Sequence, residues 1–212
     1  MMSDLTTAAI ELLKDLIGIP SFSRQEEKTA DRIGEWFEHY GIPYQRDGNN
    51  LWAKNKAFDS KKPTLLLNSH HDTVKPNAAY TNDPFEAKIE DGKLYGLGSN
   101  DAGGALVSLI ALFTHYFNKE NPKYNLLVTA SAEEEIAGDD SLSGLLPKLP
   151  KIDVAIVGEP TEMHLAVAEK GLIVFDAVIT GTPSHAAHPN TDNPIMKRPE
   201  VLNWFENFKL QK

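Results

Sequence analysis

The chain has 212 residues, which corresponds to one large domain or about one and a half domains of typical size. Hydrophobic residues make up 41% and charged residues 24% of it, the proportions of an ordinary globular protein, so a disordered or collagen-like chain is excluded. Thirty acidic against 21 basic side chains give a net charge of −9, which repels a polyanion, and we expect no nucleic-acid partner. Cysteine is absent, which excludes a disulfide scaffold, a thiolate metal site and a cysteine nucleophile.

The first 20 residues have no basic start followed by an apolar run, so we expect no signal peptide. The longest apolar run, around residues 105–113, is far shorter than the ~20 residues that a membrane-spanning helix needs. We therefore expect a cytoplasmic protein that does not contact a membrane.

Apolar residues at helical spacing predict a first helix over residues 5–17, which ends at Gly18. A second helix follows, and Ser23 with Glu26 forms the S-x-x-E pattern that is typical of a capping box at its start. Gly41 ends this helix, because glycine is favoured just beyond a helix C-terminus.

Short strands are expected on both sides of the turn at residues 47–50. Three apolar runs then predict buried strands at residues 65–67, 126–128 and 154–157, and a long apolar helix over 105–117 separates the first two. This β–α–β order predicts the α/β class, with a mostly parallel sheet and flanking helices.

The pattern changes from about Gly171. Residues 171–181 alternate between apolar and polar side chains and predict a strand, and residues 199–209 predict an amphipathic helix with a proline near its first turn. We therefore expect a catalytic domain over residues 1–170 and the beginning of a second, α+β domain over 171–212.

Ionisable residues follow each of the three predicted buried strands. They are His70, His71 and Asp72 after the first strand, Glu133, Glu134 and Glu135 after the second, and Glu159 after the third. Because open α/β sheets bind ligands beyond the carboxyl ends of their strands, we expect these side chains to meet in one site.

Asp101 lies in a glycine-rich stretch before the long apolar helix, and its simplest role is to cap that helix. Gly96-x-Gly98 also resembles the start of a dinucleotide-binding loop, but Asp101 takes the place of the third glycine and would repel a pyrophosphate. A nucleotide-dependent oxidoreductase is therefore a distant alternative. Serine hydrolase chemistry has little support, since the G-x-S-x-G motif is absent.

One nitrogen donor and several oxygen donors could come from His70, Asp101, Glu159 and one of the three glutamates. This mixture suits zinc, with cobalt or manganese as alternatives. Asp72 can accept the free ring N–H of His70 and fix its tautomer, as a carboxylate behind a metal-binding histidine does. Two ions ~3.5–4 Å apart would generate a hydroxide nucleophile and polarise a carbonyl. A glutamate that binds no metal could then carry the proton.

Five motifs occur in a fixed order: S-H-H-D-T-V, Y-G-L-G-S-N-D-A-G-G, E-E-E-I-A-G, G-E-P-T and G-T-P-S-H-A-A-H-P. In these motifs the chain resembles the zinc-dependent family of acetylornithine deacetylase, succinyl-diaminopimelate desuccinylase and glutamate carboxypeptidase. The resemblance covers about residues 5–210, and within the family the chain looks most similar to acetylornithine deacetylase.

The resemblance implies two zinc ions. In this family pattern, His70 and Glu159 bind the first ion, Asp101 bridges both ions, and Glu135 binds the second. Members of the family are longer than this chain, and a later histidine completes the second zinc site. We therefore expect the second site and the lid domain to be incomplete within these 212 residues.

The resemblance also implies roles in catalysis. Glu134 is the expected general base, Asp72 orients His70, and His185 matches a histidine that reaches across a homodimer to polarise the scissile carbonyl. The expected reaction is hydrolysis of an N-acyl amino acid, foremost N-acetylornithine to ornithine and acetate in arginine biosynthesis. Two alternatives stay open: a truncated, non-catalytic homologue with a partial metal site, and a peptidase or aminoacylase with another N-acyl amino acid or dipeptide as substrate.

Overall fold

The structure is a computed structural model that describes residues 2–120, 122–168, 170–171 and 173–209. The chain divides into two compact units, Met1–Leu165 and Ala166–Lys212. The first unit contains a five-stranded sheet and the ionisable residues that follow its strands.

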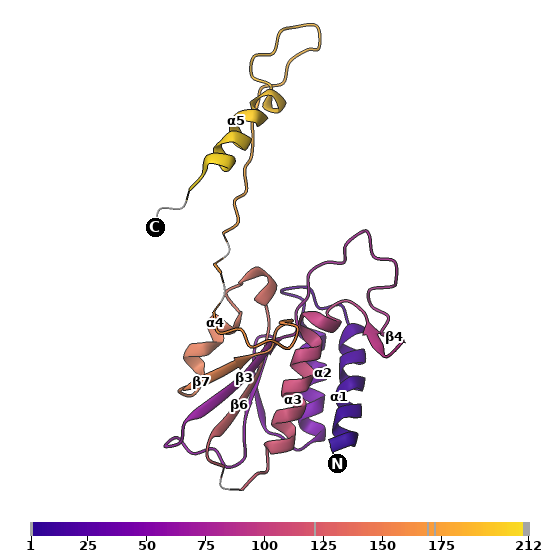
Figure 1. Cartoon of the computed structure of the whole chain (residues 1–212), viewed down its shortest axis with the longest axis vertical. Coiled ribbons are helices and arrows are strands. Elements are labelled where there is room, and N and C mark those ends of the chain that lie inside the picture. The colour runs from indigo at the N-terminus through magenta and orange to yellow at the C-terminus, as the bar shows by residue number, and fades with distance from the viewer. Residues whose placement is uncertain (1, 121, 169, 172, 210–212) are drawn as a thin grey trace. The chain divides into compact units, whose positions relative to one another are not determined.

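Three helices lie side by side along one face of this sheet: α1 (Met2–Ile17), α2 (Glu27–His39) and α3 (Gly104–Tyr116) (Figure 1). The predicted end of the first helix is confirmed, because Gly18 N still donates to the Lys14 carbonyl and the helix goes no further. The apolar sides of the three helices form the main core with the sheet. Its largest fully buried helical members are Leu12, Ile33, Phe37, Leu106, Ile110 and Phe113.

The strands of the sheet are β1 (Tyr44–Asp47), β2 (Asn50–Lys54), β3 (Thr64–His70), β6 (Asn125–Ser131) and β7 (Val154–Val157). Their order is β1-β2-β6-β3-β7. β3 is parallel to both β6 and β7, whereas β1 and β2 form an antiparallel hairpin that adds to β6. The predicted α/β class, with helices beside a largely parallel sheet, is confirmed.

The register of the parallel strands fixes where they end. His70 on β3 lies opposite Ser131 on β6, and Asn68 on β3 lies opposite Val157 on β7. Since all three strands run in the same direction, their carboxyl ends share one edge of the sheet, where α/β proteins bind their ligands.

Successive residues of β3 face opposite sides of the sheet, as the strand geometry requires. Leu67 joins the core beneath the three helices, whereas Leu66 packs with Trp52, Leu127 and Leu145 on the other face. Leu142 of α4 (Leu142–Leu145) packs against that second, smaller core, as do Leu149 and Ile152 beyond the 3₁₀ turn Leu146–Lys148. Burial on both faces explains the apolar runs in the first half of each strand, residues 65–67 of β3 and 126–128 of β6.

The remaining elements of the first unit are short. They are the hairpin of β4 (Lys88–Glu90) and β5 (Lys93–Tyr95), the irregular turn η1 (Ser99–Gly103) before α3, and the 3₁₀ turn η2 (Glu134–Ile136) after β6.

The predicted capping box of α2 is wrong. The helix begins at Glu27 with Glu26 as its N-cap, and no side chain caps it. The Ser23 hydroxyl instead donates to Asp72 Oδ2 over 2.7 Å. The helix starts three residues later than a Ser23 cap requires, and Ser23 is held by a charge-assisted hydrogen bond to the distant carboxylate.

The prediction that residues 154–157 form a buried strand is correct for the strand and wrong for the burial. Val154, Ile156 and Val157 are 61%, 47% and 53% exposed. β7 stands at the edge of the sheet and pairs with β3 alone among the described strands, so one of its backbone edges and its apolar side chains remain uncovered.

In the second unit the predicted strand over residues 171–181 is wrong for the described residues, which belong to no strand; Leu172 lies outside them. The predicted helix is present as α5 (Pro194–Asn207), five residues earlier than expected. It starts there because the Asn193 side chain accepts a hydrogen bond from Ile195 N and Pro194 occupies the first turn. The Phe175 ring packs on aromatic rings at the end of this helix.

None of the helices within the described part of the chain is long and apolar enough to cross a membrane.

The exposed edge of β7 predicts self-association of the chain, because an open apolar edge strand pairs with other copies. We expect Ile156→Lys to lower the average mass measured by size-exclusion chromatography with light scattering, because a lysine on an edge strand opposes pairing. The control is Ile10→Lys on α1. Ile10 is 41% exposed, close to the 47% of Ile156, but it does not lie on the edge strand β7. A wild-type chain that is monomeric at every concentration would contradict this prediction.

Candidate metal-binding active site

His70 is the centre of the group at the carboxyl edge of the sheet. Its side chain is 1% exposed, and three carboxylates surround its Nε2 atom. Asp101 Oδ1 lies 3.2 Å away, and Glu134 Oε2 and Glu159 Oε2 each lie 3.8 Å away. These residues come from four separate segments, and the strand register brings them together.

Asp101 reaches His70 because the backbone before α3 is irregular. The turn starts after Gly98, whose φ of +73° is one that glycine adopts readily. A Cβ atom on Gly103 would lie only 2.5 Å from the Gly98 carbonyl oxygen, so the tight turn requires glycine there too. The cap of α3 is Gly103, and no side chain caps this helix. The Asp101 carboxylate is therefore directed to His70 rather than to the helix end.

The backbone after β6 is bound to Asp72. Glu134 N donates to Asp72 Oδ1 over 3.1 Å, and Glu135 N donates to Asp72 Oδ2 over 3.2 Å. On its other side, Asp72 lies behind the imidazole: His70 Nδ1 is 3.0 Å from the Asp72 carbonyl oxygen and 3.3 Å from Oδ1. Since both of these atoms are acceptors, Nδ1 carries the proton and Nε2 is left for the carboxylates or a metal ion.

The charges around His70 strongly favour a cation. Burial by itself lowers the pKa of His70, but hydrogen bonds and charges from Asp72 and Glu159 outweigh burial and raise it to about 11. Burial raises the pKa of Glu134, and the charges of Glu159, Asp72 and Asp101 raise it further. Burial also raises the pKa of Glu135, as does the charge of Asp101. Several carboxylates thus share one imidazole, and a divalent cation would relieve their repulsion.

Three of these residues offer ligand atoms to a single ion. One atom each from His70, Asp101 and Glu159 lies within 4.8 Å of the others. One imidazole nitrogen and two carboxylate oxygens form the type of donor set that catalytic zinc uses, with a coordination position left for water or substrate. The residues present therefore fit a metal ion of this kind.

The expected site residues are distributed as follows. His70, Asp72, Asp101, Glu134 and Glu159 lie together, and Glu135 follows in the same turn. The His185 side chain is exposed in the second unit, where its Nδ1 accepts a hydrogen bond from Ala187 N.

His71 is adjacent to His70 and has the opposite environment. It is buried beside α2, where its Nε2 lies 3.0 Å from the Asn49 carbonyl and its Nδ1 lies 2.9 Å from Thr29 Oγ1. Burial lowers its pKa to about 4, so this ring is neutral at physiological pH. The alternation of side chains along the chain separates the two histidines into a polar site and a core.

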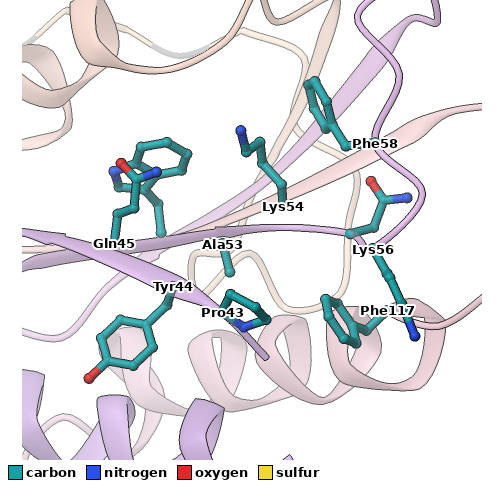
Figure 2. A pocket seen from close by; sticks show the side chains of 10 residues that line it. Pro43, Tyr44, Gln45, Ala53, Lys54, Lys56, Phe58 and Phe117 are labelled. Carbon is teal, nitrogen blue, oxygen red and sulfur yellow. The ribbon is translucent and has the colours of Figure 1, made fainter. Parts of the chain in front are cut away.

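A separate surface pocket lies away from the residues around His70. Its volume is about 350 Å³, and it is located where β2 extends past the end of β1, with Tyr44 and Lys54 among its walls (Figure 2). The Lys54 ammonium lies over the Phe58 ring, 5.2 Å from its centre. No histidine or carboxylate is among the described residues that line it, so it lacks the groups for metal chemistry.

Sequence reasoning missed two residues that support the site: Ser23 binds Asp72, and Glu26 accepts from Glu133 N. The expectation that His71 joins the site is wrong, because its ring is buried against Thr29 and Asn49. The S-x-x-E spacing of Ser23 and Glu26 draws attention to both residues, but it predicts a helix cap. It gives no indication of their actual partners, Asp72 and Glu133, which lie 49 and 107 positions away.

His71 predicts a pH dependence of folding in the metal-free chain. Its folded pKa of about 4 lies below the ordinary value of 6.5, so the unfolded chain binds more protons between these pH values. The stabilisation is complete above pH 6.5 and is lost as the pH falls to 4, with a slope of up to about 1.4 kcal/mol per pH unit. We expect His71→Gln to remove this part of the slope in urea unfolding, and His39→Gln, at an exposed histidine, to keep it. Equal slopes in wild type and His71→Gln would refute the assignment.

Comparisons with known proteins agree with this geometry. The sequence profile of peptidase family M20/M25/M40 matches residues 66–200. Succinyl-diaminopimelate desuccinylase of Buchnera aphidicola subsp. Acyrthosiphon pisum (strain Tuc7) is 31% identical, over 97% of this chain and 58% of that protein. The enzyme of the same name from Rhodospirillum centenum (strain ATCC 51521 / SW) is 29% identical, over 92% and 55%. The chain thus spans a little over half the length of these relatives.

A solved structure shows the same fold. The M20 family metallo-carboxypeptidase Sso-CP2 from Sulfolobus solfataricus superposes with a TM-score of 0.59 and 26% identity, over 71% of this chain and 37% of that one. The family resemblance inferred from the order of the motifs is confirmed. The profile match covers more than half of the chain, and the chain belongs to peptidase family M20/M25/M40, a family of metal-dependent hydrolases.

Proposed function

We propose that the protein to which this chain belongs is a metal-dependent amidohydrolase that removes the acyl group from an N-acyl amino acid. The observation that carries this proposal is the convergence of ligand atoms from His70, Asp101 and Glu159 beside the Glu134 carboxylate. That combination supplies a metal-binding group and a separate proton carrier, the two parts that metal-assisted hydrolysis of an amide uses.

In the proposed arrangement, His70 and Glu159 would hold one zinc ion, Glu135 would hold a second, and Asp101 would serve both. Cobalt is the alternative metal. A bound ion of this kind lowers the pKa of water and polarises a carbonyl group. The Asp72 carboxylate keeps the His70 ring in the tautomer whose Nε2 faces the ligand group.

Glu134 has the environment of a general base. Its Oε2 lies 3.8 Å from His70 Nε2, beside the three residues whose ligand atoms converge, and burial raises its pKa in the metal-free chain. It takes a proton from the attacking water, whose oxygen bonds to the acyl carbon. As the carbon–nitrogen bond breaks, Glu134 returns the proton to the leaving amine, so the products are a carboxylate and a free amine.

Two acyl groups, acetyl and succinyl, are candidates for the group that is removed. N-acetylornithine is the substrate expected from the sequence resemblance, and arginine biosynthesis is its context. The two curated relatives described above are desuccinylases, which favours an N-succinyl amino acid such as N-succinyl-diaminopimelate. We take the succinylated substrate as the first to test and the acetylated one as the second.

The proposal includes a cytoplasmic homodimer in which His185 of one copy reaches the site of the other. The hydrogen bond that His185 Nδ1 accepts from Ala187 N leaves the proton of the neutral ring on Nε2. A ring in that tautomer can donate to a substrate carbonyl. This role rests on the family resemblance.

The first measurement is bound metal per chain after zinc reconstitution, by elemental mass spectrometry on desalted protein. We expect zinc in the wild type and its loss in His70→Ala, because removal of the central nitrogen leaves only mutually repelling carboxylates. One ion that is lost in His70→Ala but retained in Glu135→Ala would mean that the chain holds a half-site. Failure of the wild type to bind any divalent metal would contradict the proposal.

The second measurement is hydrolysis of the two substrates by the zinc-loaded protein. We expect Glu134→Gln to retain zinc and to lose turnover by about 10²–10⁴-fold, because the amide cannot carry the proton. Glu120→Gln is the matched control at an exposed glutamate and should keep full activity. Undiminished turnover in Glu134→Gln would exclude it as the base.

A further inference from the structure

The loop before α2 lies directly beside the strand that carries His70. Thr73 N donates to the Ser21 carbonyl over 2.9 Å, and Phe22 forms an isolated parallel bridge with Thr73. These backbone contacts fix the loop against the segment that follows β3. They bring Ser23, the next residue of the loop, to the Asp72 carboxylate.

Asp72 is fully buried, and both of its carboxylate oxygens are used. Oδ1 faces His70 Nδ1 at 3.3 Å and Glu134 N at 3.1 Å. Oδ2 accepts from the Ser23 hydroxyl at 2.7 Å and from Glu135 N at 3.2 Å. Ser23 makes the shortest of these contacts. Without its hydroxyl, Oδ2 would keep one backbone donor, and the carboxylate could rotate away from the imidazole.

Glu26 supports the same turn from the other side. Its carboxylate is also fully buried, and Oε1 accepts from Arg24 N at 2.8 Å and from Glu133 N at 3.2 Å. Oε2 accepts from Asn49 Nδ2 at 2.9 Å. Three consecutive backbone amides after β6, those of Glu133, Glu134 and Glu135, are therefore bound by Glu26 and Asp72.

We propose that Ser23 and Glu26 are positioning residues for the metal centre: the Ser23 hydroxyl sets the rotation of Asp72, and with Glu26 it fixes the turn that carries Glu134 and Glu135. The inference rests on the proposed function, since it assigns these residues to the same metal site. It adds a loop some 50 to 110 residues away in the sequence to the groups that determine how well the site binds its ion.

The test is the zinc affinity of the 212-residue chain, measured by competition with a chromophoric chelator. We expect Ser23→Ala to weaken zinc binding by about 10–100-fold, the usual effect of removing a group that orients a ligand. Ser23→Thr keeps a hydroxyl and should restore most of the affinity. Ser60→Ala is the matched control, because it removes a hydroxyl from an exposed serine of the same unit.

Two further readouts separate positioning from general stability. The visible absorption of the cobalt-substituted chain should change in Ser23→Ala, because a rotated His70 alters the ligand field, while thermal unfolding of the metal-free chain stays close to that of the wild type. In the metal-loaded protein, Glu26→Gln should lower kcat with little change in KM, because it displaces Glu134 rather than substrate-binding groups. If Ser23→Ala fails to fold, Ser23→Cys, whose thiol is a weak donor, takes its place with the same expected loss of affinity.

The outcomes are distinct. Equal zinc affinity and an unchanged cobalt spectrum in a folded Ser23→Ala or Ser23→Cys variant would overturn this inference and leave the proposed function standing. A wild-type chain that binds no zinc would overturn the proposed function, and the inference would fall with it. Weakened binding in Ser23→Ala, with rescue by Ser23→Thr, is the result that supports it.

Discussion

The buried carboxylate of Asp72 is the interaction on which the candidate site depends. An ionised group with no exposure to water is tolerated only when donors surround it, and four donors do so here. They come from the loop before α2, from the end of β3 and from the turn after β6. Burial raises the pKa of Asp72, but the hydrogen bonds from His70, Ser23 and Glu135 N outweigh it and keep the pKa below its usual range. The carboxylate therefore joins three distant segments into one rigid group.

The candidate site also depends on the register of the parallel strands. β3 lies between β6 and β7, and its register with both places the residues after all three strands at one edge. The result is an unfavourable crowd of carboxylates around the His70 ring. Burial raises the pKa of Glu134, and the neighbouring carboxylates raise it further. Such an arrangement costs free energy in the empty protein, and it becomes favourable when a divalent ion binds. The repulsion between these carboxylates is thus the property that favours binding of a divalent cation at this site.

Much of this could be predicted from local patterns. Helical spacing predicted α1 and α3, apolar runs predicted β3 and β6, and the polar residues after each strand indicated where a site forms. The errors share one cause, which is that the deciding partner is remote. Ser23 has the spacing of a helix cap but binds Asp72, and residues 171–181 alternate like a strand but have no described strand beside them. The exposure of β7 likewise depends on what lies next to it in space.

The sequence by itself determined the order of helices and strands, the residue types available for metal chemistry and the family, because periodicity and motifs are local properties. Only the tertiary structure decided how different the surroundings of the two adjacent histidines are. His70 is surrounded by carboxylates and His71 is buried in the core, so their pKa values move in opposite directions, to about 11 and about 4. It also decided that Ser23 and Glu26 support the site. These outcomes depend on burial and on charges brought together from segments far apart in the chain, and neither can be read from neighbouring residues.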